Sequence, residues 1–254
     1  MKKRKAGIGI FVIVLIITAV RVKSMDSHRI SGRILAENIA GPGMLRLVEQ
    51  SMQSRARKTS VTEIAVKERK HPQAVLTFDD GPDIRYTPLL LDGLKERNVR
   101  VSFFLLGEKV EQYPELVERM QKEGHLVGNH TYHHVQLNKL NETKAREEIL
   151  KTNNLIYETT GVYPLYLRPP FGAWKKNLEL CVEMLPVFWT IDTLDWKVQN
   201  TEKIVRTVQE QIEDGAIILM HDEYDTSVEA ALQVVDELKN QGYELVTVDQ
   251  LILP

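Results

Sequence analysis

The sequence predicts an α/β fold in which about seven short parallel strands alternate with helices over residues 71–254. Short apolar runs recur along this stretch, helical patterns lie between them, and glycines follow several of the helical patterns. Strands that are apolar on both faces are typical of parallel sheets covered by helices. The expected strands are Ala74–Phe78, Arg100–Leu106, Leu126–Asn129, Leu165–Arg168, Val187–Ile191, Ala216–Met220 and Glu244–Val248.

Helical patterns fill the intervals between these runs. Asn141 is a candidate cap, and Pro114 stands at an allowed first-turn position. Four expected helices are followed by a glycine that can end them, namely Gly124, Gly161, Gly215 and Gly242. A doubly wound sheet and a (β/α) barrel both fit this alternation. The expected helices are Leu89–Arg97, Pro114–Glu123, Asn141–Thr160, Lys175–Glu183, Thr201–Glu213 and Ser227–Gln241.

The amino-terminal segment predicts export from the cytoplasm. Residues 2–5 are basic, residues 6–20 carry no charge, and Arg21 and Lys23 follow. This pattern is typical of a signal anchor or a signal peptide, and the lack of a clear cleavage signal favours an uncleaved membrane anchor over residues 1–23. The positive-inside rule then predicts an extracytoplasmic location for the rest of the chain. We expect residues 24–70 to form a membrane-proximal linker of uncertain structure.

The composition excludes some classes of function. The 254 residues carry a net charge of −2, whereas a general nucleic-acid binder has a basic excess, so we expect no nucleic-acid partner. Cys181 is the single cysteine, which excludes an intrachain disulfide. Its apolar neighbours indicate a core thiol rather than a nucleophile. No obligate protein partner is evident from the sequence.

Two adjacent carboxylates, Asp79 and Asp80, stand where the first expected strand meets the turn signal Gly81-Pro82. Neighbouring side chains of a strand point to opposite faces, so both carboxylates can serve one site only if the strand ends there. Adjacent carboxylates repel unless a cation neutralises them, which favours a functional interpretation. The alternative is a surface turn, because Asp, Gly and Pro are ordinary turn residues.

A histidine cluster follows the third expected strand. His130 and His134 are four residues apart, a spacing that places both on one face of a helical turn and suits a single metal ion. Neutral imidazole is a common Zn²⁺ ligand, and Asp80 is the natural third ligand. We expect His133 to face elsewhere, because it adjoins His134. The alternative is a solvated polar loop.

Three further polar clusters follow expected strands. In Arg168–Gly172, two prolines stiffen a segment that could fix the Arg168 side chain and the Phe171 N–H. Asp192–Trp196 combines carboxylates with an indole, as sugar-binding sites do, and Leu219–His221 delivers a histidine at a strand end. Each has a structural alternative when taken alone: a stiff loop, an Asx turn under a tryptophan lid, and a structural histidine.

Together the five motifs, in this order, resemble the NodB-homology polysaccharide deacetylases of carbohydrate esterase family four. The motifs are Thr77–Pro82, His130–His134, Arg168–Gly172, Asp192–Trp196 and Leu219–His221, and the resemblance covers about residues 72–254. It implies a distorted (β/α) barrel, a divalent metal ion (Zn²⁺, with Co²⁺ as the alternative) and removal of acetyl groups from sugars.

The resemblance also implies a role for each motif residue. It makes Asp80, His130 and His134 the metal ligands. Asp79 would be the general base, oriented by Arg168, and His221 the general acid, paired with Asp195. Phe171 would donate its backbone N–H to the oxyanion, Trp196 would line the sugar groove, and Leu219 would line the acetyl pocket. The family often has Tyr where Phe171 stands, which matters little for a role that uses the backbone.

The expected function is therefore hydrolysis of N-acetyl groups on an acetylated polysaccharide of the cell envelope, with peptidoglycan as the first candidate. The alternatives are an O-acetyl esterase on xylan or another acetylated glycan, and a non-catalytic glycan-binding domain. A metalloprotease fits less well, because the sequence lacks a His-Glu-x-x-His helix.

Overall fold

The computed structural model describes residues 70–174 and 184–252. The predicted anchor, the predicted linker up to residue 69 and the expected helix Lys175–Glu183 lie outside the described residues. Among the helices that are described, none has the length and apolar character needed to cross a membrane.

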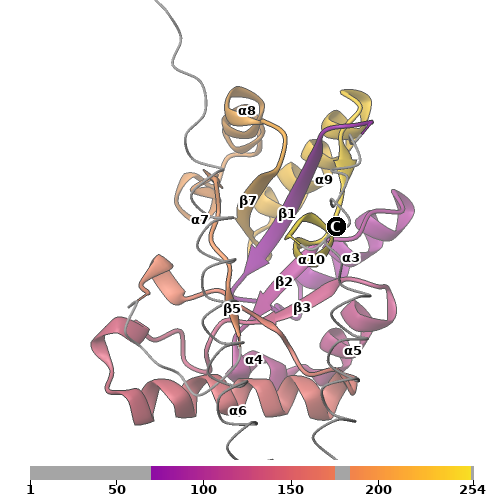
Figure 1. Ribbon diagram of the computed structural model, residues 1–254. Helices are drawn as coiled ribbons and strands as arrows, with labels where there is room; N and C mark the ends of the chain where they lie inside the picture. Colours follow the sequence, from indigo (N-terminus) through magenta and orange to yellow (C-terminus); the bar gives the residue numbers. More distant parts are fainter. Residues whose placement is uncertain (1–69, 175–183, 253–254) are drawn as a thin grey trace, which may run out of the picture. The chain divides into compact units, whose positions relative to one another are not determined.

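The described residues form a parallel sheet in the order β5-β4-β3-β2-β1-β7-β6, with β8 beside the start of β1. Figure 1 shows β1 between β7 on one side and β2 and β3 on the other. Every strand pair is parallel, which confirms the predicted α/β class. The strands are β1 (Gln73–Asp79), β2 (Ser102–Leu105), β3 (Leu126–Asn129), β4 (Tyr166–Leu167), β5 (Leu185–Pro186), β6 (Ile191–Asp192), β7 (Ala216–His221) and β8 (Glu244–Leu245).

The strand order shows that the sheet curls. Strands β5 and β6 occupy opposite edges of the sheet, yet only residues 187–190 separate them in the chain. An extended chain of this length spans at most about 18 Å, so the two edges must approach one another. The fold is thus the distorted (β/α) barrel that the family resemblance implies, and the barrel is incompletely closed. The expected strand Val187–Ile191 is wrong: residues 187–190 form a bridging segment between β5 and β6, and only Ile191 belongs to a strand.

Helices cover the outside of the barrel. Helix α6 begins after Asn141, whose side chain accepts the Lys144 N–H at 2.9 Å, and it ends at Gly161 with a φ of 73°. Helix α3 begins three residues before the expected start, and α4 was not expected. The helices are α3 (Tyr86–Glu96), α4 (Gly107–Gln112), α5 (Pro114–Lys122), α6 (Glu142–Thr160), α7 (Asp195–Val198), α8 (Thr201–Gln211), α9 (Asp225–Asn240) and α10 (Val248–Ile252), with 3₁₀ turns at Leu137–Lys139 and Pro170–Gly172.

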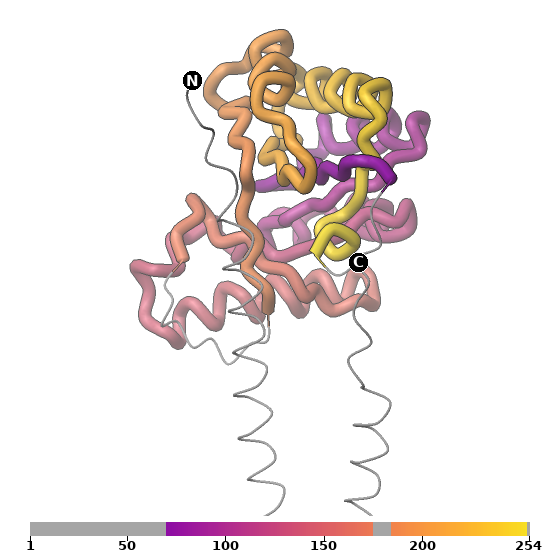
Figure 2. Tube along the Cα trace, turned by 45° about the horizontal axis from the view of Figure 1, so that its top comes forward, coloured from indigo at the N-terminus to yellow at the C-terminus, as the bar shows by residue number. Residues whose placement is uncertain are grey.

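The alternation of side chains along β1 sets the position of the site. Ala74, Leu76 and Phe78 belong to the large core between the sheet and its outer helices. Val75 belongs to a second core inside the barrel, which α10 closes at the amino-terminal ends of the strands. Because strand side chains alternate, Asp79 shares the inward face of Val75 and stands in the barrel interior at the carboxyl-terminal ends of the strands. Figure 2 shows the carboxyl-terminal segment passing beside the start of β1, where β8 pairs with it.

Candidate active site

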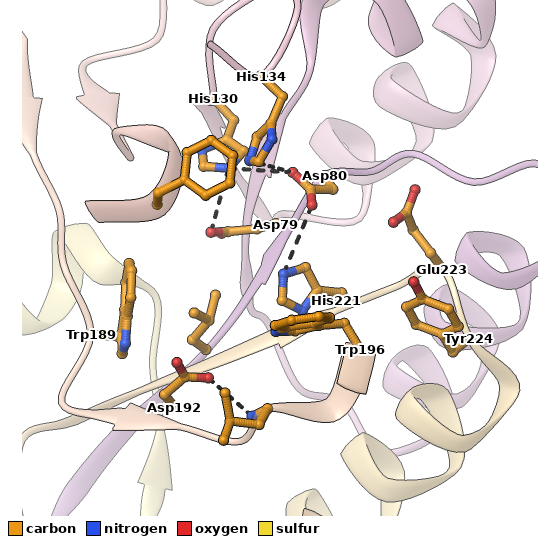
Figure 3. A pocket seen from close by; sticks show the side chains of 13 residues that line it. Asp79, Asp80, His130, His134, Trp189, Asp192, Trp196, His221, Glu223 and Tyr224 are labelled. Carbon is orange, nitrogen blue, oxygen red and sulfur yellow. Dashed lines mark hydrogen bonds and ion pairs between the residues drawn. The ribbon is translucent and has the colours of Figure 1, made fainter. Parts of the chain in front are cut away.

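Five strands end at one rim of the barrel, and the side chains that follow them face a cavity of about 470 Å³ (Figure 3). Strand register brings Asp79 on β1 opposite His221 on β7. Eight of the ten predicted site residues line the cavity, namely Asp79, Asp80, His130, His134, Phe171, Trp196, Leu219 and His221. The other two, Arg168 and Asp195, are fully buried. Arg168 pairs with Asp79, and Asp195 pairs with His221.

The adjacent carboxylates reach one site because the strand ends between them. β1 ends at Asp79, and Asp80 adopts a left-handed conformation with a φ of 70°. In a continued strand the Asp80 side chain would point to the outer face of the sheet. The turn directs both carboxylates into the cavity, as the Gly81-Pro82 signal indicates.

Asp80, His130 and His134 form a possible metal site. One ligand atom from each residue can be chosen so that all three lie within 4.8 Å of one another. Asp80 Oδ1 lies 3.3 Å from His130 Nε2 and 3.4 Å from His134 Nε2. These separations equal the edge of a tetrahedron with metal–ligand bonds of about 2.0–2.1 Å.

Further observations support this donor set. Asp80 Oδ1 is buried without a hydrogen-bond partner, although two imidazole nitrogens lie 3.3 and 3.4 Å away. His130 Nδ1 lies 2.6 Å from the Arg168 carbonyl oxygen, so Nδ1–H donates there and Nε2 keeps its lone pair for a cation. Burial alone would raise the pKa of Asp80, but contact with His130 and the charges of His134 and His221 hold it below its usual range.

Arg168 fixes the orientation of Asp79. Its Nη1 donates to Asp79 Oδ1 at 2.8 Å and to Thr77 Oγ1 at 2.6 Å, and its guanidinium lies 4.2 Å from the centre of the Phe104 ring. The second oxygen of Asp79, Oδ2, faces His130 Nε2 at 3.7 Å. One carboxylate oxygen is therefore held, and the other points toward the possible metal position.

Asp195 fixes the orientation of His221. Its Oδ1 lies 2.8 Å from His221 Nδ1, and its Oδ2 accepts the His221 backbone N–H at 2.8 Å. Burial alone would lower the pKa of His221, but the hydrogen bond and charge of Asp195, with the charges of Asp79 and Asp80, raise it to about 9. His221 Nε2 faces the cavity, 3.9 Å from Asp80 Oδ2. The arrangement presents an imidazolium to the cavity at neutral pH.

Comparison with known proteins places this chain in a family. The polysaccharide deacetylase family model matches residues 66–187. The peptidoglycan-N-acetylmuramic acid deacetylase PdaA of Bacillus subtilis is 35% identical over 190 residues, which cover 72% of this chain and 72% of that protein. The chain belongs to the polysaccharide deacetylase family.

Two further comparisons support this membership in the polysaccharide deacetylases. The peptidoglycan-N-acetylglucosamine deacetylase PgdA of Listeria monocytogenes is 41% identical over 185 residues, 73% of this chain and 40% of that protein. The chain thus matches well under half the length of this relative. The solved structure of the peptidoglycan deacetylase PdaC from Bacillus subtilis superposes with a TM-score of 0.70 at 41% identity, covering 72% of this chain and 91% of that one. Carbohydrate esterase family four, to which these deacetylases belong, is metal-dependent.

Two other histidines of the chain lie away from the possible metal site. His133 has 58% of its side chain exposed and pairs through Nδ1 with Glu148 at 2.8 Å, so it faces outward as expected. His125 precedes β3 at the opposite end of the barrel, where its Nδ1 accepts the Val101 N–H. Burial lowers the pKa of His125 to about 4, which fits a neutral structural histidine.

Sequence reasoning missed several residues that line the cavity. Trp189 lies in the bridging segment and was assigned to a strand interior. Glu223 and Tyr224 follow the His221 motif after one residue, and their position after a strand end is a signal that could have identified them. Asp192 belongs to the Asp192–Trp196 cluster that the sequence singles out, but no role is assigned to it there; it lines the cavity with one oxygen held by the Leu194 N–H at 3.0 Å.

Proposed function

We propose that this protein is a metal-dependent hydrolase that removes acetyl groups from N-acetylated sugars of peptidoglycan. The observation that carries the proposal is the arrangement around Asp80: an oriented carboxylate, Asp79, and an aspartate-held imidazolium, His221, face the same three-ligand position. Amide hydrolysis needs a base and an acid on the reacting group together with stabilisation of the oxyanion.

The ion in this proposal is Zn²⁺, held by Asp80, His130 and His134, with Co²⁺ as the alternative. Two imidazoles and one carboxylate are a common zinc donor set. When bound, a divalent ion polarises the acetyl carbonyl and lowers the pKa of water.

The acid and base steps follow from the hydrogen bonds around each residue. Asp79 Oδ2 takes a proton from the attacking water while Arg168 holds Oδ1. The water oxygen bonds to the acetyl carbon, and the carbon–nitrogen bond then breaks. His221 gives its Nε2 proton to the departing nitrogen, because an amine leaves poorly unless it is protonated. The products are acetate and the free amine of the sugar.

Three residues contact the substrate in this proposal. Phe171 has a left-handed backbone with a φ of 59°, and we assign its N–H to the oxyanion. Leu219 is buried at the cavity wall and contacts the acetyl methyl. Trp196 is half exposed, and its indole offers a face on which a sugar ring can stack.

Two observations support peptidoglycan as the substrate. The relatives described above act on peptidoglycan, one on N-acetylglucosamine and one on N-acetylmuramic acid residues. The basic and apolar amino-terminal segment predicts an extracytoplasmic enzyme anchored to the cell membrane or secreted, on the side where peptidoglycan lies.

The test is acetate release from peptidoglycan and from N-acetylglucosamine oligomers, with and without a chelator. We expect release from both that stops on chelation and returns with Zn²⁺. Acetylxylan is the comparison substrate, and faster release from it than from the amide substrates would favour the O-acetyl esterase. No release from any of the three substrates would favour the non-catalytic glycan-binding domain.

A further inference from the structure

The segment between the two histidine ligands has an unusual backbone. Thr131 and His134 both adopt left-handed conformations, with φ values of 68° and 55°. Residues other than glycine adopt this region at an energetic cost and keep it only when surrounding contacts hold it. The contacts that hold residues 131–134 therefore decide where the two imidazoles point.

One side chain makes three of these contacts. Glu148, on the inner face of α6, has 16% of its side chain exposed. Its Oε2 accepts the backbone N–H of Tyr132 at 3.0 Å and that of His133 at 2.9 Å, and its Oε1 lies 2.8 Å from His133 Nδ1. Hydrogen bonds to a carboxylate are shorter and stronger than those between neutral groups.

The same helix holds the start of the segment through Asn129. Asn129 Oδ1 accepts the Thr131 N–H at 2.7 Å, and its Nδ2 donates to Asn153 Oδ1 at 2.6 Å and to the Ile149 carbonyl at 2.9 Å. On the opposite side, the Gly107 N–H donates to the Thr131 carbonyl at 2.9 Å. Consecutive turns of α6 thus bind the backbone on which both histidine ligands stand.

We infer that Glu148 is a positioning residue for the metal site: it binds the two residues before His134 and so fixes the geometry of the His130 and His134 pair. The inference rests on the metal site of the proposed function. Glu148 touches neither the possible metal position nor the cavity, so it acts through the backbone alone. Groups that orient metal ligands typically change metal affinity by about 10–100-fold when they are removed.

The experiment measures Zn²⁺ affinity of the full chain by competition with a chromophoric chelator, without any substrate. We expect E148A to bind Zn²⁺ at least about tenfold more weakly than the wild type. E147A is the matched control, because Glu147 is an exposed glutamate of the same helix, one position away, and its affinity should not change. E148Q keeps an oxygen acceptor for the two N–H groups and should retain most of the affinity.

Two further measurements separate positioning from a general loss of structure. H133A removes the side-chain contact to Oε1 and the ring contact with Tyr132 but keeps both backbone hydrogen bonds to Oε2, so it should weaken Zn²⁺ binding less than E148A does. The visible spectrum of the Co²⁺-loaded protein reports coordination geometry, and it should change in E148A and stay as in the wild type for E147A. If E148A does not fold without metal, E148Q is compared with H133A instead. E148Q must then bind Zn²⁺ at least as tightly as H133A does.

Tight Zn²⁺ binding by E148A, or an equal loss in E148A and E147A, would overturn the inference. A wild-type chain that binds no Zn²⁺ would overturn both the inference and the metal in the proposed function. Normal Zn²⁺ binding without acetate release would leave the positioning role standing and refute only the proposed reaction.

Discussion

The buried pair of Asp195 and His221 gives a sharp test of the proposed acid. Asp195 accepts two hydrogen bonds from His221, and its charge favours the imidazolium. The pKa of His221 is raised from 6.5 to about 9, which corresponds to about 3 kcal/mol in favour of the charged form. Because Asp195 contributes most of the raising effect and burial opposes it, Asp195→Asn should return the pKa of His221 to 6.5 or below.

The sign and size of the effect on rate follow from this change. A general acid works only while protonated, so the rate falls as the pH rises through its pKa. If the pKa of His221 falls to 6.5 and no cation is bound, the protonated fraction at pH 8 drops from about 0.9 to about 0.03, a loss of about 30-fold in the active form, whereas at pH 6 the loss is less than about twofold. A bound cation lowers the pKa of His221 in both proteins. The quantity to compare is therefore the shift, between the two proteins, of the pH at which kcat falls on the alkaline side of its optimum, which we call the basic limb.

The assay is kcat for acetate release from an N-acetylglucosamine oligomer at saturating substrate, measured from pH 5 to pH 10 with Zn²⁺ present. Asp192→Asn is the matched control, because the same charge is removed from the same loop without any contact to His221. Its absolute rate can change, but its basic limb should stay in place. An Asp195→Asn profile that keeps its basic limb, or loses equal rate at pH 6 and pH 8, would refute the acid assignment.

Three other changes test the base, the metal site and the core. Asp79→Asn should keep stoichiometric Zn²⁺ and lower kcat by about 10²–10⁴-fold, and a wild-type rate would exclude Asp79 as the base. His130→Ala should lose both Zn²⁺ and acetate release; metal analysis that still finds one ion per chain would contradict the ligand assignment. Gly128→Ala should lower the melting temperature, because a Cβ there would lie 2.7 Å from a Phe104 ring carbon, and overpacking typically costs about 1–3 kcal/mol. An unchanged melting temperature would mean that this ring can move aside.

The fold class and the place of the site could be predicted because both depend on short-range patterns. An apolar run that ends in polar residues marks a strand whose end reaches the rim, as at Asp79 and His221. Parallel strands bring their carboxyl ends to the same rim, so residues far apart in sequence meet there. The expected outward position of His133 followed equally simply, from its place next to His134.

Other features depend on contacts that no local pattern specifies. Thr77 lies inside an apolar run, where the sequence gives its hydroxyl no evident role. In the structure this hydroxyl accepts a hydrogen bond from Arg168 across the barrel. The three contacts of Glu148 join an exposed-looking position of a long helix to a loop 15 and 16 residues earlier. Such pairings appear only once the curl of the sheet and the rotation of each helix are known.

The incorrectly predicted strand Val187–Ile191 shows why the curl matters for chemistry. An uninterrupted strand there would pair along one edge of the sheet and leave the rim open. Instead, residues 187–190 cross from β5 to β6, and the Val187 carbonyl lies 3.4 Å from Arg168 Nε. The Trp189 ring covers Gly172, where a Cβ would lie 3.3 Å from the indole, and it lies 5.8 Å from the Arg168 guanidinium. The segment therefore encloses the arginine that orients Asp79 and forms a wall of the cavity. This packing explains the apolar side chains of Val187 and Trp189, which indicated a strand, whereas Phe188 is exposed.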